Sequence, residues 1–394
     1  MKSKLLSRLM ATNDRRDTPP PRNIPNPNRT TSINQPTSLT ERAPSISDDE
    51  SHRSAVNRIA EETLNAIRDG GYPYKGVVRD LTEAVKEAKS KTVYYPPSDI
   101  TRWASSTKPN RSQSSPTHIS ILHITTLDAA RLLDNVYKSN PSDYRITGIL
   151  NFASPTEPGG DFMNGSESQE EFIARSSTLY PALTTDEAQE FYKLHTRENA
   201  EITAAYYSHG MIYSPNICIF RDDDGNWTYP FQVDVLSCAA VDAREVRKAN
   251  DFITSTDRRR AYHLEVGIEK EMSERMGGIL YLFERNGVRN IILGAFGTGV
   301  FRNRVVTVAR IWAHLLLVPE ARFKDSFDRV IFAITGEETF EDFHSAFNAW
   351  GQPRVTELGW SSNQSSPSRG QSSEIRPSSS VWLEMAHGPG LDKP

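Results

Sequence analysis

The sequence predicts an α/β fold in which helices cover a largely parallel β-sheet. Short apolar segments alternate with segments of helical periodicity between residues 54 and 350. Such alternation is typical of strands joined by crossover helices. Two of the apolar segments lead into glycine-rich loops. The roughly 300 residues between two polar ends suffice for one large core.

The two ends of the chain have compositions that predict disorder. Residues 1–53 contain seven prolines, and the first aromatic residue of the chain is Tyr72. Residues 361–380 contain ten serines. Such segments bury too little apolar area to offset the entropy lost on folding. We therefore expect disordered tails over 1–53 and 351–394, and one catalytic or binding domain over 54–350.

Charge and composition exclude several classes of protein. The chain has 46 Lys and Arg against 50 Asp and Glu, a net charge of −4, which argues against a general nucleic-acid binder. No apolar run has the length of about 20 residues that a membrane helix needs. Two cysteines, Cys218 and Cys238, cannot form a disulfide framework, so we expect an intracellular protein, cytoplasmic or nuclear. The basic start, Met1 to Met10, leaves a mitochondrial transit peptide open.

Periodicity in the first half of the domain defines three helices and two strands. Apolar residues recur at helical spacing from Val56 to Ile67, and Gly70 ends that run. Helices are predicted over 54–69, 82–89 and 127–137, and strands over 118–125 and 146–152.

The second half predicts a hairpin, followed by helices and strands in alternation. Asp222, Asp223 and Asp224 separate two apolar strands, and the glutamate that a calcium loop requires at its end is missing. A solvated turn is therefore expected there. Strands are predicted over 216–220, 229–236, 290–294 and 330–335, and helices over 257–286, 303–317 and 339–349.

A loop between a strand and a helix, residues 151–171, carries the first candidate site. Its paired glycines, Gly159 and Gly160, allow a ligand to approach the backbone closely. The start of the following helix favours an anion such as a diphosphate. Glu170 and Glu171 lie in the first turn of that helix.

Glu171 has two interpretations that can coexist. Ser168 and Glu171 have the spacing of a capping box, in which the glutamate accepts from the Ser168 N–H. A glutamate held beside a ligand-binding loop is also well placed for proton transfer. The helix dipole lowers the pKa of such a glutamate, so enclosure by the ligand has to raise it before it acts as an acid.

The second candidate loop runs from Gly294 to Phe301 and again joins a strand to a helix. It is neither a dinucleotide fingerprint, because Arg302 stands at the third glycine position, nor a Walker loop. Two glycine loops at the carboxyl ends of strands in one sheet indicate a nucleotide crevice.

Other motifs are weaker. The nine histidines show no metal-binding spacing, and no serine-hydrolase elbow is present. Glu337 and Glu338 resemble the first glutamate pair, but their context indicates a helix cap. The run from Arg258 to Arg260 is interpreted as a solvated helix face.

At the two loops the sequence resembles the microbial-type poly(ADP-ribose) glycohydrolase catalytic domain, a branch of the macrodomain superfamily. The family motif is a glycine run, a short spacer and Gln-Glu-Glu. It stands here as Pro158-Gly159-Gly160-Asp161, followed by Gln169-Glu170-Glu171. Segments 151–154, 175–180 and 235–240 and the second loop also resemble the family, and the likeness runs from about residue 54 to 350.

The resemblance implies a macrodomain-like three-layer α/β/α sandwich with a mixed central sheet, and cleavage of the ribose–ribose bond of poly(ADP-ribose). It implies that Glu171 is the general acid and base and that Glu170 holds ribose hydroxyls. Glycosidic cleavage requires protonation of the leaving oxygen, which one glutamate can supply before it activates water. The implied substrate-binding residues are Asn151, Gly159, Gly160, Asp161, Gln169, Gly297, Thr298, Gly299, Val300 and Phe301.

Two residues depart from the family pattern. Asp161 stands in place of the third glycine, and Arg302 stands where a small residue is expected. We expect Asp161 to weaken ligand binding relative to glycine, with its side chain turned outward or toward ribose.

Three functions therefore remain open: a poly(ADP-ribose) glycohydrolase, an ADP-ribose reader without turnover, and a hydrolase of mono-ADP-ribosylated protein. The retained glutamate pair favours an enzyme. The expected partner is an ADP-ribose polymer or an ADP-ribosylated protein, without sequence-specific nucleic acid, membrane, cofactor or metal, and we expect a monomer.

Overall fold

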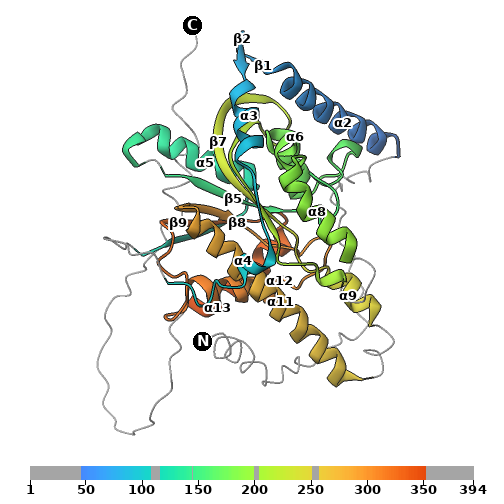
Figure 1. The fold of residues 1–394 in the computed structure, drawn as a ribbon, viewed down its shortest axis with the longest axis vertical. Helices are drawn as coiled ribbons and strands as arrows, with labels where there is room; N and C mark the ends of the chain where they lie inside the picture. The colour runs from blue at the N-terminus through green and yellow to red at the C-terminus, as the bar shows by residue number, and fades with distance from the viewer. Residues whose placement is uncertain (1–45, 108–115, 144, 199–203, 251–256, 352–394) are drawn as a thin grey trace, which may run out of the picture.

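A seven-stranded mixed sheet lies between two layers of helices (Figure 1). The computed structural model describes residues 46–107, 116–143, 145–198, 204–250 and 257–351. The strands of the large sheet are β3 (Val93–Tyr95), β4 (His118–Leu122), β5 (Thr147–Phe152), β6 (Met211–Arg221), β7 (Trp227–Cys238), β8 (Asn290–Leu293) and β9 (Arg329–Ala333). The predicted three-layer α/β/α sandwich is thereby confirmed.

The order of the strands across the sheet is β3-β6-β7-β5-β8-β9-β4. The five strands from β7 to β4 pair in parallel, while β3, β6 and β7 pair antiparallel. Parallel neighbours end at the same edge of the sheet, so the loops that follow β5, β7 and β8 emerge side by side.

Alternating side chains of the central strands pack into two separate cores. Ile149 of β5 and Ile292 of β8 belong to one cluster. Leu150 of β5 and Ile291 of β8 belong to the other. Both faces of a parallel sheet are buried in this fold, which explains why these strands read as continuous apolar runs.

The helices divide between the two faces of the sheet, as the two clusters show. The first layer contains α3 (Thr82–Lys91), α5 (Thr126–Ser139), α6 (Gln169–Ser176), α7 (Leu179–Leu183) and α8 (Asp186–Glu198). The second layer contains α4 (Pro97–Ile100), α9 (Ala243–Ala249), α11 (Arg258–Arg285), α12 (Val305–Leu316) and α13 (Glu337–Gly351).

A separate helix, α2 (Ile46–Asp69), lies along the outside of the first layer beside the short hairpin of β1 (Gly71–Tyr74) and β2 (Val77–Asp80) (Figure 1). It begins earlier than the predicted helix over 54–69, so the predicted limit of the N-terminal tail at residue 53 falls inside it. Residues 1–45 and 352–394, which contain most of both predicted tails, lie outside the described residues.

Two strand boundaries differ from the prediction by three residues or more. The strand predicted over 118–125 leaves the sheet after Leu122, because the Thr125 side chain accepts a hydrogen bond from Asp128 N and begins α5. The strand predicted from Asn216 begins at Met211 instead. Asn216 itself has a φ of 58° at an irregularity in the pairing, so a sequence that looks like a strand start marks a bulge.

The helices predicted over 82–89, 127–137, 257–286, 303–317 and 339–349 are present with shifted ends. The elements that were not predicted are β1, β2, β3, α4, α7, α8 and α9, all of them short except α8. Both cysteines are free and buried. Across the described part of the chain, no helix combines the length and the apolar character that crossing a bilayer requires.

Candidate active site

The two predicted loops meet at one edge of the sheet. β5 pairs in parallel with β7 on one side and β8 on the other, and Asn151 lies opposite Ser237. The Phe152 and Phe296 rings, one beside each loop, have centroids 5.5 Å apart. The strand order therefore brings together residues that lie about 140 positions apart in the sequence.

Gln169 fixes the start of α6 to the end of β5. Its Oε1 accepts from the Phe152 N–H at 2.8 Å, and its Nε2 donates to the Leu150 carbonyl at 2.7 Å and to Thr126 Oγ1 at 3.1 Å. Both ends of the side-chain amide are thus used inside the protein, so Gln169 positions the two glutamates that follow it.

Glu170 is enclosed, with 2% of its surface exposed. Asn151 Nδ2 donates to its Oε1 at 3.1 Å, and the Ser154 N–H donates to its Oε2 at 2.6 Å. Burial raises the pKa of Glu170 to about 8, and the neighbouring Glu171 adds to this, while the hydrogen bonds from Ser154 and Asn151 oppose it.

One polar atom of the Asn151 side chain has no hydrogen-bond partner among the described residues. Its Nδ2 is shared between Glu170 and Ser237 Oγ, the latter at 3.0 Å. Its Oδ1 is buried and has no hydrogen-bond partner among the described residues. A buried acceptor without a partner is costly, and it is a feature more common at functional sites than elsewhere. Ser237 was not singled out in the sequence, because only the pairing of β5 with β7 brings it here.

Glu171 is held by the loop in front of its own helix. Its Oε1 accepts from the Asp161 N–H at 3.1 Å, and its Oε2 accepts from Ser168 Oγ. The predicted capping box is wrong in this detail, because the N-cap Ser168 makes no side-chain cap bond and its hydroxyl donates to the carboxylate instead. The carboxylate therefore points at the glycine loop.

Gly160 is the position where this geometry requires glycine. Its φ is +61°, and a Cβ there would overlap Oε1 of Glu171. Gly159 has a φ of +75° and is packed against Phe162, Tyr180 and Ala174. The backbone of the loop therefore lies directly against the Glu171 carboxylate. A side chain larger than that of glycine at position 160 would displace the carboxylate.

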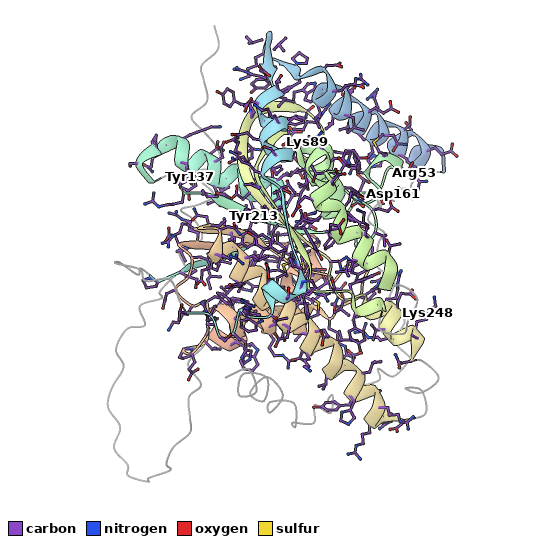
Figure 2. All side chains as sticks on the ribbon, in the orientation of Figure 1. Arg53, Lys89, Tyr137, Asp161, Tyr213 and Lys248 are labelled. Atoms are coloured by element: carbon purple, nitrogen blue, oxygen red, sulfur yellow. The ribbon has the colours of Figure 1, made fainter. Side chains whose placement is uncertain are left out.

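Asp161 is exposed, and its Oδ1 accepts a hydrogen bond from Asn164 Nδ2 within the short 3₁₀ helix η2 (Phe162–Asn164). Its φ of −99° suits a non-glycine residue. Figure 2 labels Asp161 on the same side of the molecule as Arg53 of α2. The side chain is turned along the loop, and its placement outward or toward ribose in a complex stays a prediction.

Two side chains missed by sequence reasoning support this loop. Arg175 is 4% exposed and donates to the carbonyls of Phe162 and Ser166, at 3.3 and 2.6 Å. Thr63 of α2 in turn donates to the Arg175 carbonyl at 2.6 Å. Arg175 lies within a segment that resembles the family, but only the fold shows which carbonyls it binds.

The second loop is closed by Asn303, whose Nδ2 donates to the carbonyls of Gly297 and Val241, at 2.9 and 2.8 Å. Gly297 has a φ of +73°, and a Cβ there would overlap Ala240. The hydroxyl of Thr298 donates back to the Ala295 carbonyl. These bonds hold the loop in a tight turn beside β7.

The tip of the second loop faces outward. Gly299 has no neighbour within 4 Å of an added Cβ, and Val300 is 64% exposed. Phe301 is half-buried against Tyr207, with ring centroids 6.0 Å apart. Arg302, at the position where a small residue was expected, has a φ of +55° in the left-handed region.

Among the described residues, no group of three or more His, Cys, Asp or Glu side chains is arranged to hold a metal ion. What the site offers is a pair of carboxylates, one amide oxygen without a partner and two glycine loops. This combination suits an uncharged, hydroxyl-rich ring linked to a diphosphate.

Comparison with known proteins places these features in a family. A family model of the microbial-type PARG catalytic domain, where PARG stands for poly(ADP-ribose) glycohydrolase, matches residues 60–222. A search of curated proteins found no match.

Three solved structures of bacterial enzymes are similar to most of the chain. The poly(ADP-ribose) glycohydrolase from Thermomonospora curvata is 32% identical with a TM-score of 0.64, and the alignment covers 76% of this chain and 100% of that one. The same enzyme bound to the inhibitor ADP-HPD is 31% identical, with 75% and 99% coverage and a TM-score of 0.62. The Deinococcus radiodurans enzyme in complex with ADP-ribose is 26% identical, with 68% and 98% coverage and a TM-score of 0.56.

Proposed function

The chain belongs to the microbial-type poly(ADP-ribose) glycohydrolase family, and we propose that it hydrolyses the ribose–ribose bonds of poly(ADP-ribose) with Glu171 as general acid and base. The observation that carries this proposal is the position of the Glu171 carboxylate. It accepts from the Asp161 N–H and lies against the bare backbone of Gly160, in the loop that is expected to bind the substrate.

In the proposed reaction the protonated Glu171 donates its proton to the bridging oxygen of the leaving ribose. The bond from that oxygen to the anomeric carbon breaks through an oxocarbenium-like state. A water molecule then adds to the anomeric carbon and gives a proton to the Glu171 carboxylate. The products are ADP-ribose and a polymer that is one unit shorter, and the enzyme is regenerated.

Glu170 has a different role in this proposal. Its carboxyl is buried among donors of its own chain, and its pKa of about 8 keeps it protonated at neutral pH. A neutral carboxyl can both donate to and accept from ribose hydroxyls, and it adds no second buried anion beside Glu171. The free Oδ1 of Asn151 supplies a further acceptor.

The Gly297–Phe301 loop completes the proposed cleft by binding the diphosphate and the distal ribose. Its exposed tip is free to make these contacts, and the side chain of Phe301, half-buried on Tyr207, is positioned to press on the ribose. The bound state of the Deinococcus enzyme, a complex with ADP-ribose, supports a site for the same ligand here.

The decisive experiment compares Glu171→Gln with the unaltered protein on labelled polymer and on mono-ADP-ribosylated protein. The amide keeps the size of the side chain but cannot cycle a proton, so turnover should fall by about 10²–10⁴-fold while ADP-ribose affinity changes little. Glu338→Gln is the matched control, because Glu338 lies in the first turn of α13 and is exposed.

The outcomes separate the candidate functions. Release of ADP-ribose from polymer supports the glycohydrolase, and release from mono-ADP-ribosylated protein alone supports the other hydrolase. Binding of ADP-ribose with no release from either substrate makes the protein a reader. Full activity of Glu171→Gln rejects the assigned role of that residue.

A further inference from the structure

A second recess lies behind the Gly297–Phe301 loop, on the face of the sheet opposite α6. It is a groove of about 620 Å³ between the first half of α11 and the start of α12, and Arg247 of α9 closes one side. Figure 1 shows α9 and the start of α11 at the same end of the molecule. The groove contains none of the residues assigned to the active site.

The groove and the active site nevertheless share a wall. Asn303 lines the groove and donates to the Gly297 carbonyl, while Arg247 donates to the Arg302 carbonyl at 2.7 Å. The Phe301 carbonyl accepts from the Arg244 N–H of α9 at 3.1 Å. A ligand that is long enough can therefore contact the second loop from the active site and continue into the groove.

The charged lining of the groove suits an anion. Three arginines, Arg247, Arg304 and Arg310, face two glutamates, Glu265 and Glu269, so the lining has a positive excess. The arginine run at the start of α11 adjoins the groove, since Ala261 and Tyr262 come directly after it and line the groove themselves.

Part of this positive lining is not used inside the protein. Arg304 is 65% exposed, and its ion pair with Glu265 is long at 3.4 Å. Arg310 pairs with Glu269 at 2.5 Å, but its Nε is buried without a partner among the described residues. The N-cap of α12, Arg304, makes no side-chain cap bond, so the helix start leaves N–H groups for a phosphate.

The groove also presents exposed apolar surface. Tyr262 is 46% exposed and Val306 is 55% exposed, and both belong to the lining. An exposed aromatic ring beside arginines is the combination that binds the bases and phosphates of single-stranded nucleotides. An acidic peptide would use the arginines and leave Tyr262 and Val306 in water, so the lining favours a nucleotide.

We propose that this groove binds a second ADP-ribose unit of the polymer, adjacent to the unit that occupies the active site. Its diphosphate would lie against Arg304 and the start of α12, and its adenine would stack on Tyr262, while Arg247 is held by Glu265 and the Arg302 carbonyl and forms the wall. This inference rests on the proposed function, since it concerns the same substrate. It makes the enzyme prefer polymer over ligands that carry a single ADP-ribose.

The test measures affinity for poly(ADP-ribose) and for free ADP-ribose side by side, in a Glu171→Gln background that prevents turnover. Arg304→Glu and Tyr262→Ala should each weaken polymer binding by about five- to tenfold, and the Arg304 effect should shrink with added salt. Affinity for free ADP-ribose should change less than about twofold. Lys86→Glu is the matched charge control, on α3 and 72% exposed.

A second measurement covers the case in which the background variant does not fold. With the active enzyme, Arg304→Glu should lower kcat/KM for polymer while the inhibition constant of free ADP-ribose stays constant. Equal losses for polymer and monomer, or no loss for polymer, would overturn the proposal. A loss confined to mono-ADP-ribosylated protein would also overturn it, because an acidic peptide would then occupy the groove.

Failure of the proposed function has a different signature. A protein that does not hydrolyse polymer can still bind it, and a selective loss of polymer affinity in Arg304→Glu would then support the groove without the enzyme. An active enzyme whose polymer affinity is unaffected by both substitutions would keep the function and reject the groove.

Discussion

Glu170 is enclosed by its own chain at the start of α6, and its proton makes the stability of the fold depend on pH. The folded state raises the pKa of Glu170 from 4.5 to about 8. Between these values the folded protein holds a proton that the unfolded chain releases, so the free energy of unfolding falls as pH rises through this window. Each pKa unit corresponds to about 1.4 kcal/mol.

Glu170→Gln should remove this pH dependence. Relative to the unaltered protein, the variant should gain stability as pH rises from about 5 to about 9, because it has no carboxyl to ionise in the buried site. Urea unfolding at both pH values measures the difference, with Glu338→Gln as reference. Parallel stability curves for the two proteins would show that the pKa of Glu170 is not raised.

Asp161 tests whether a charge in the loop acts on the ligand. Its side chain is exposed and bonded to Asn164, which directs it along the loop. Asp161→Gly should therefore leave the salt dependence of ADP-ribose binding unchanged. Calorimetric titration at low and high salt checks this. Tighter, salt-sensitive binding in the glycine variant would mean that the carboxylate faces the phosphates.

At the scale of elements, the second loop stores backbone strain at Arg302. A non-glycine residue in the left-handed region costs about 1 kcal/mol. Arg302→Gly should raise the free energy of unfolding by about 0.5–1 kcal/mol, whereas Arg302→Ala, which keeps the Cβ, should change it by less than about 0.5 kcal/mol. Chemical denaturation of both variants separates the backbone effect from loss of the side chain. Equal changes in the free energy of unfolding for the two variants would show that loss of the Arg302 side chain, and not the backbone conformation, causes the effect.

Helix α2 supports the first loop from outside. Thr63 is fully buried and bonded to the Arg175 carbonyl. Thr63→Val keeps the shape but leaves that carbonyl without a donor, so we expect a loss of about 1–3 kcal/mol. Thr196→Val is the control, because Thr196 is exposed and bonds only within its own helix. Thermal and urea unfolding measure the stability of both variants. Similar losses of stability in the two would show that the bond from α2 does not support the loop.

An element can be predicted from sequence when the residues that determine it lie within its own segment. The strands β5 and β8 were predicted to within one residue, since buried parallel strands read as apolar runs. By contrast, Val77 and Val78 of the β1–β2 hairpin are exposed. The contacts that stabilise this hairpin come from other segments of the chain, so its own sequence does not predict it. The start of α2 was missed because residues 47–53 are all polar and give the segment no apolar face.

The same distinction holds within the candidate site. Gln169, Glu170 and Glu171 were identifiable from their motif, and glycines from their conformational demands. Ser237 lies in a segment that resembles the family, but neither it nor Thr63 could be assigned a contact, because only the fold brings them to β5 and α6. The predicted bond from the Ser168 N–H to Glu171 is replaced, because the Glu171 carboxylate accepts from the Ser168 hydroxyl and the Asp161 N–H.

At the scale of the whole molecule, the site is assembled from both halves of the chain. ADP-ribose should therefore slow amide exchange at Gly159–Asp161 and at Gly297–Phe301 together. The control is the hairpin Gly71–Asp80, which has no contact with either loop among the interactions described here and should exchange unchanged. Hydrogen–deuterium exchange followed by mass spectrometry measures all three segments. Protection of one loop alone would mean that the ligand does not bridge them.

The position of β4 in the sheet also has a consequence for the life of the newly made chain. β4 forms the edge of the sheet and pairs only with β9, which follows it by about 210 residues. During synthesis, β4 leaves the ribosome long before its partner is translated. Until then, water or a chaperone must satisfy its backbone N–H and C=O groups. Spontaneous refolding should be slow, because completing the sheet requires pairing between segments that are far apart in the sequence.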